Sequence, residues 1–120
     1  MKDMTDALPG LARVREKFLS LLEDRCGKIV EYTLAAWQAT EDTEKRTHLT
    51  GAGTILHQIA GTAGSLGLQD LGEAAQSCEQ AIIDFMDLPN APPEMCSHII
   101  MEINSFVTCC EDQLTRTGSD

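Results

Sequence analysis

The chain of 120 residues is long enough for one domain with a single hydrophobic core. Its formal net charge of −10 argues against nucleic acid or an anionic membrane as a partner. Acids and bases cancel up to residue 40, so the acidic excess belongs to the later part of the chain. We interpret this excess as a solvated surface that aids solubility.

The cysteines indicate a reducing compartment. They are five, an odd number, and no CxxC spacing occurs among them. We therefore interpret them as reduced thiols in helix cores and predict neither a disulfide scaffold nor a metal site. The sequence shows no signal peptide and no apolar run of membrane length, and we expect a cytoplasmic location with no membrane partner.

The first half of the chain predicts two helices. Apolar residues recur every three or four positions, whereas the alternation typical of strands is nearly absent. We expect a long first helix from about Pro9 to Ala39, with a possible kink near Gly27. The second helix should end at about Ser65, because Gly67 suits the position just after a helix C-terminus.

The second half predicts two more helices. The third should begin near Leu68 and end before Pro89. The fourth should start at Pro92 or Pro93, because proline is favoured in the first turn of a helix, and it should run to about Leu114.

These elements predict one architecture for a single domain that spans residues 1–120. Four amphipathic helices with short connections indicate an all-α, up-down-up-down antiparallel four-helix bundle. The polar segments 1–7 and 115–120 are expected to be flexible tails.

One stretch of the second helix, residues 50–67, has an unusual composition. On a helix one arc of it is apolar and should be buried: Leu56, Ile59, Ala63 and Leu66. A second arc, roughly 130° away, carries small residues around the single imidazole of His57: Thr50, Gly53, Thr54, Ala60, Gly61 and Gly64. Each interior glycine costs about 1 kcal/mol of helix propensity relative to alanine. Either close approach of a partner or close packing of a neighbouring helix explains these glycines, and their angle away from the apolar arc favours the partner.

His57 is the candidate functional residue. We interpret His48 and His98, the other two of the three histidines, as packed or edge residues. An exposed imidazole is mostly unprotonated at neutral pH and is a competent nucleophile. An ordinary exposed histidine is the alternative interpretation.

The remaining parts of an enzyme are missing from the sequence. It contains no phosphate-binding loop, kinase motif or serine nucleophile elbow. We therefore expect no ATP site, no cofactor of its own and no self-sufficient enzyme. A nucleophile on a convex helix needs a partner to complete the site.

Residues 57–67, HQIAGTAGSLG, resemble the signature of histidine-containing phosphotransfer (HPt) domains, which is roughly H-x-[LI]-K-G-[ST]-[AS]-x-x-[LFIV]-G. The matching residues are His57, Ile59, Gly61, Thr62, Ala63, Leu66 and Gly67. With the order and length of the helices, the resemblance covers about residues 9–112. It implies that His57 accepts a phosphoryl group from the aspartate of one receiver domain and passes it to another in a two-component phosphorelay. It also implies a monomer, with Mg²⁺ supplied by the receiver domain.

The sequence departs from the family at Ala60, where a lysine is usual. Gln58 offers a neutral hydrogen bond in its place. The departure leaves a second hypothesis open, a degenerate HPt-like bundle that sequesters a response regulator without phosphotransfer. On the first hypothesis the receiver-docking surface consists of Thr54, Ala60, Gly61, Gly64 and Ser65, completed by exposed apolar side chains at the ends of the first two helices.

A residue of the third helix should orient the His57 ring. If the second and third helices form a hairpin about Gly67, residues 76–80 lie level with His57. Glu79 or Gln76 can then reach a ring nitrogen. We favour Glu79, and an ordinary exposed helix glutamate is the alternative.

Overall fold

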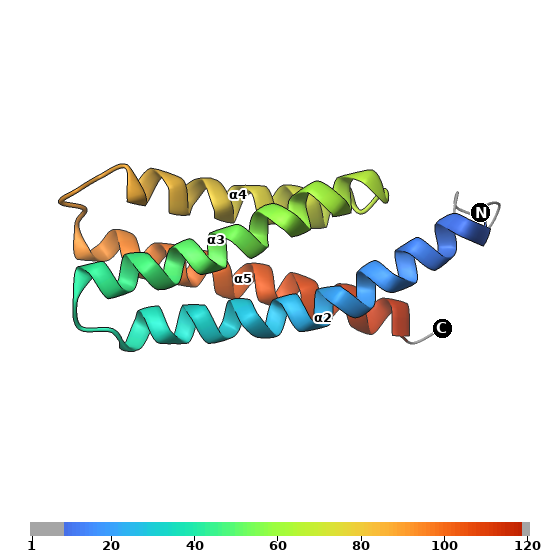
Figure 1. Cartoon of the computed structure of the whole chain (residues 1–120), viewed down its shortest axis with the longest axis horizontal. Coiled ribbons are helices and arrows are strands. Elements are labelled where there is room, and N and C mark those ends of the chain that lie inside the picture. Colours follow the sequence, from blue (N-terminus) through green and yellow to red (C-terminus); the bar gives the residue numbers. More distant parts are fainter. Residues whose placement is uncertain (1–8, 119–120) are drawn as a thin grey trace.

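The computed structural model describes residues 9–118 of the chain. This part is entirely helical apart from short connections, and its helices are α2 (Pro9–Gln38), α3 (Asp42–Ser65), α4 (Gln69–Met86) and α5 (Pro93–Gly118). Consecutive helices pack side by side, and α5 also packs against α2, which closes the ring (Figure 1). The predicted all-α four-helix bundle and its element order are confirmed.

Two helices differ from the expectation, α2 in its N-terminal part and α5 at its C-terminus. Figure 1 shows that α2 is not straight, because its N-terminal part turns away from the rest of the bundle. The helix remains continuous through the exposed Gly27, where a kink was expected. At the other terminus α5 continues to Gly118 instead of ending at about Leu114, because none of residues 115–117 is a strong helix breaker. Residues 1–8 and 119–120 lie outside the described part. Of the expected tails, 1–7 and 115–120, only residues 115–118 are therefore described, and they belong to α5.

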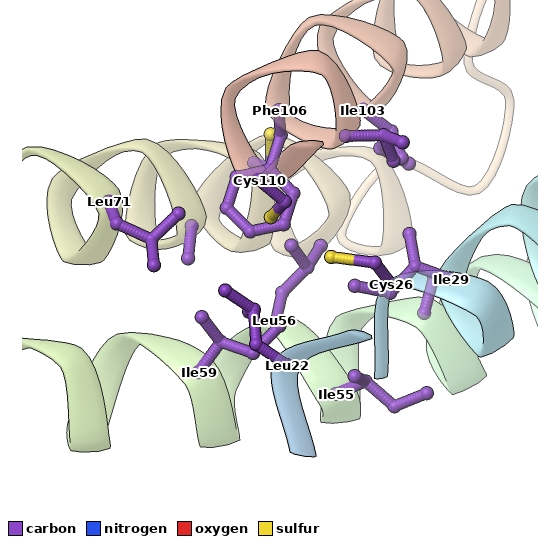
Figure 2. Packing of buried hydrophobic residues seen from close by; sticks show 14 of the residues in the cluster. Leu22, Cys26, Ile29, Ile55, Leu56, Ile59, Leu71, Ile103, Phe106 and Cys110 are labelled. Atoms are coloured by element: carbon purple, nitrogen blue, oxygen red, sulfur yellow. The ribbon is translucent and has the colours of Figure 1, made fainter. Parts of the chain in front are cut away.

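Apolar residues at helical spacing form one core between the four helices. Figure 2 shows Leu22 of α2, Leu56 of α3, Leu71 of α4 and Phe106 of α5 converging on it. Each such side chain gains roughly 2 kcal/mol by leaving water. Leu56 is fully buried, and this fixes the rotation of α3 about its own axis. The next residue along the helix, His57, is thereby turned about 100° away from the core.

The turn between α3 and α4 is a Schellman motif. Gly67 adopts a φ of +77°, a left-handed conformation that glycine accepts without strain. The N–H of Leu68 donates to the carbonyl oxygen of Ala63 over 3.0 Å, and the N–H of Gly67 donates to that of Gly64 over 3.4 Å. The short turn makes α3 and α4 an antiparallel hairpin, as the position of Gly67 predicted.

At the end of the hairpin opposite Gly67, Arg46 links the start of α3 to the end of α4. Its guanidinium lies 2.7 Å from the Asp42 carboxylate, and it donates to the carbonyl oxygen of Phe85 over 3.2 Å and to that of Leu88. The same group lies 4.5 Å from the centre of the Phe85 ring. Arg46 thus satisfies carbonyl groups at the C-terminus of α4 and holds it against the first turns of α3.

Candidate functional site

His57 lies on the outer surface of α3, at the seam with α4. Its side chain is 75% exposed, and its Nδ1 atom lies 2.8 Å from Oε2 of Glu79, whose side chain is 20% exposed. The structure therefore brings together the histidine and the glutamate that the sequence placed at the same level. Gln76, the other candidate, is exposed on α4 and lines a different hollow.

This contact determines which ring nitrogen is available. A carboxylate without a proton only accepts hydrogen bonds, so a hydrogen bond across the 2.8 Å contact with Glu79 needs a proton on Nδ1 of His57. The unprotonated nitrogen is then Nε2, and it has no hydrogen-bond partner within residues 9–118. In a neutral ring this arrangement leaves the lone pair on Nε2, the nitrogen away from Glu79, as a nucleophile requires.

The register of the hairpin places Glu79 at His57. Three pairs meet along the seam, each about two helical turns from the next. Near the turn, a Cβ atom on Gly72 would lie 3.4 Å from the backbone nitrogen of Gly64. The next pair is His57 with Glu79, and the third is Thr50 with Met86, whose Oγ1 and Sδ atoms are 3.9 Å apart. The pairing of residues along the seam thus places the Glu79 carboxylate level with the His57 ring.

The residues predicted to surround His57 form a low, polar surface on α3. Thr54, Gly61, Gly64 and Ser65 are exposed, and Gln58 is exposed beside them. A side chain on Gly61 or on Gly64 would meet open space, so the packing of the helices does not require glycine at either position.

The hydroxyl groups on this surface are turned back onto their own helix. Thr54 donates to the carbonyl oxygen of Thr50 over 3.2 Å, and Ser65 donates to that of Gly61 over 3.3 Å. Both hydroxyl protons are therefore directed at the helix backbone and not at an approaching partner. A partner can therefore approach the backbone of α3 closely around His57.

Two residues of the predicted surface have another role in the structure. Gly53 is buried, and a Cβ atom there would lie 3.6 Å from Ile82 of α4. Ala60 is half-buried and packs against the core cluster. These two positions therefore face the neighbouring helix or the core and do not belong to the exposed surface around His57.

A groove of about 500 Å³ adjoins His57 along the α3–α4 seam. Its lining is Thr50, Gly53, Thr54, His57, Gln58, Glu79, Ile82, Ile83, Met86 and Asp87. Ile83 and Met86 are 43% and 37% exposed, respectively, and sequence reasoning missed them, having placed the exposed apolar side chains on the first two helices. The spacing to Glu79 was an available signal, because residues four and seven positions further along share its helix face.

Other chemistry-bearing residues lie away from this site. His48 is half-buried on α3, and His98 is exposed on α5. All five cysteines are unpaired, and burial raises the pKa of Cys78 to about 12. The described residues contain no cluster of histidine, cysteine or acidic side chains suited to a metal ion and no helix long and apolar enough to cross a membrane.

Comparison with known proteins identifies the family. The family model of the Hpt domain matches residues 13–116. Neither the curated proteins nor the solved structures gave a match. Hpt domains are phosphotransfer carriers of two-component signalling systems, and they interact with receiver domains. The family match extends over most of the chain and agrees with its four-helix fold, so the protein belongs to the Hpt domain family.

Proposed function

We propose that this protein is a phosphorelay carrier in which His57 receives the phosphoryl group from the phosphoaspartate of one receiver domain and passes it to the aspartate of another. The observation that carries the proposal is the 2.8 Å contact between Nδ1 of His57 and Oε2 of Glu79. It directs the proton to Nδ1 and leaves Nε2 exposed for reaction.

The proposed step transfers phosphorus between two atoms. The lone pair of Nε2 attacks the phosphorus in line, the N–P bond forms, and the P–O bond to the aspartate breaks, so that its electron pair returns to the carboxylate. The proton stays on Nδ1, and the imidazole ring becomes positively charged. The carboxylate of Glu79 stabilises this charge, and the same bonds form and break in reverse when the acceptor aspartate attacks.

The partner supplies the remaining groups in this proposal. Mg²⁺ and the acidic pocket belong to the receiver domain, and His57 needs only to be reachable in line. The small residues Gly61 and Gly64 support such an approach, because they leave the face of α3 without protruding side chains. The amide of the exposed Gln58 is placed one residue from His57, where it can donate to a phosphoryl oxygen.

A labelling experiment tests the proposal. The protein is incubated with phosphorylated receiver domains encoded by the same genome, and acid-labile, base-stable phosphate is measured. We expect label on the wild type and on His98→Gln, which removes another exposed histidine, but none on His57→Gln. Label that persists in His57→Gln contradicts the assignment. A receiver domain that binds tightly and never transfers its phosphate would support the sequestering alternative, which the absence of lysine at Ala60 keeps open.

A further inference from the structure

We propose that the receiver domain docks across the α3–α4 seam, with an apolar side chain in the groove beside His57 and a basic side chain against the acidic rim of that groove. The inference rests on the proposed phosphotransfer function. It assigns part of the partner recognition to α4, beside the predicted docking surface on α3.

The groove is built into the seam by the register of the hairpin. One end is formed by the contact between His57 and Glu79, and the other end by Met86 against α3. Gly53 and Ile82 are buried between the two helices and belong to the lining of the groove. The groove therefore adjoins the reactive histidine directly.

The wall on α4 is apolar and exposed. Ile83 and Met86 project three residues apart from the same helix face, and both line the groove. The carboxylate of an attacking or leaving aspartate must come within bonding distance of Nε2 of His57. Any receiver domain that achieves this covers the adjacent groove, so both apolar side chains lose contact with water. Because the groove is continuous with the reaction site, we take the receiver domain to be its occupant.

The rim of the groove is acidic. Asp87 and Glu79 line it, and Glu79 is already paired with His57. The carboxylate of Asp87 pairs with no cation among the described residues, in contrast to Asp42, which pairs with Arg46. A lysine or arginine beside the apolar residue of the partner therefore complements this rim.

A second apolar groove provides the comparison. It has a volume of about 610 Å³ and lies between α2 and α5, where Trp37 and Met101 are 60% and 67% exposed. In the ring of helices this seam is opposite the α3–α4 seam. A receiver domain seated there cannot reach His57, so Met101 offers a matched control for Met86.

The experiment compares receiver-dependent and receiver-independent phosphorylation of the same variants. Phosphoramidate labels histidine chemically and needs no docking. Transfer is measured from a phosphorylated receiver domain that labels the wild type. We expect Ile83→Asp and Met86→Asp to lower receiver-dependent transfer about thirtyfold, the scale for losing a central interface contact. Labelling by phosphoramidate should stay within about twofold of wild type, and the thermal midpoint should stay within about 3 °C, since both positions are exposed.

Charge reversal supplies an independent measurement. Asp87→Lys should slow transfer severalfold at low ionic strength and less at high salt, because screening weakens attraction between exposed charges. Met101→Asp should transfer at the wild-type rate at both salt concentrations.

The outcomes separate this inference from the proposed function. Normal transfer by Ile83→Asp and Met86→Asp would overturn the docking site and leave His57 as the carrier. A decrease in Met101→Asp equal to that in Met86→Asp would also overturn it. If phosphoramidate labels the wild type but no receiver domain does, the proposed function fails, and the docking inference fails with it.

Discussion

Replacement of Glu79 should slow phosphoryl transfer without removing the nucleophile. The contact between Oε2 of Glu79 and Nδ1 of His57 is 2.8 Å long. Hydrogen bonds to charged groups contribute about 1.5 to 3 kcal/mol. The His57 side chain is 75% exposed, so solvent screening places this contact at the lower end of that range. Since a change of about 1.4 kcal/mol in the barrier is tenfold in rate, Glu79→Ala should lower the transfer rate about tenfold.

The loss should appear in the rate because the contact strengthens during the reaction. The ring gains positive charge as Nε2 bonds to phosphorus, and only interactions that are stronger in the transition state accelerate a step. Glu79→Gln keeps an oxygen that accepts from Nδ1 but removes the charge, so its rate should lie between those of wild type and Glu79→Ala. Glu73→Gln is the matched control, because Glu73 is exposed on the same helix and accepts a 3.2 Å hydrogen bond from Gln69.

Two measurements decide the matter. Rapid-quench kinetics with a phosphorylated receiver domain give the transfer rate, and nitrogen NMR of the His57 ring reports which nitrogen carries the proton. Wild type should show the proton on Nδ1, and Glu79→Ala should show a mixture of tautomers. If Glu79→Ala transfers at the wild-type rate with an unchanged tautomer, the carboxylate is an ordinary surface partner and the orientation argument is refuted.

Three further predictions follow from the packing. Gly61→Ala should raise the free energy of unfolding by about 0.5–1 kcal/mol, whereas Gly51→Ala should not, because its Cβ would lie 2.5 Å from a ring carbon of Tyr32; equal gains in urea unfolding would contradict this. Gly61→Glu should leave the circular dichroism spectrum unchanged and block receiver-dependent transfer, and normal transfer would remove Gly61 from the docking surface. Burial raises the pKa of Cys78 to about 12, so iodoacetamide at pH 8 should alkylate the half-buried Cys109 far sooner; equal rates in the native protein would refute that.

The sequence predicted the helices and the level of Glu79 because both depend on local signals. The spacing of apolar residues determines which arc of α3 is buried. Leu56 is fully buried, and because the next residue lies about 100° around the helix, His57 points away from the core. The turn at Gly67 is short, so residues on either side of it can be counted into register. A longer or irregular connection would have removed that information.

The groove could not be predicted in the same way. The angular position of Gly53 on a single helix places it near His57, but only the position of α4 decides that Ile82 covers it. Ile83 and Met86 are apolar, so a sequence pattern assigns them to the core or leaves them unassigned. Their exposure depends on how far α4 is rotated about its own axis, which is set by its contacts with α3 and α5 together.

The same seam accounts for the alanine that stands where the family usually has lysine. The carbonyl oxygen of Ala60 lies 3.5 Å from the point that a Cβ atom of Gly72 would occupy, and its side chain is half-buried against the core. Small residues on both helices let α4 approach α3 closely at this level. Because Gly72 and Glu79 lie about two turns apart on one face of α4, that approach also brings the carboxylate to the His57 ring. Ala60 thus belongs to the packing of α3 against α4, and in the proposed transfer Gln58 would offer a hydrogen bond while the positive charge would come from the partner.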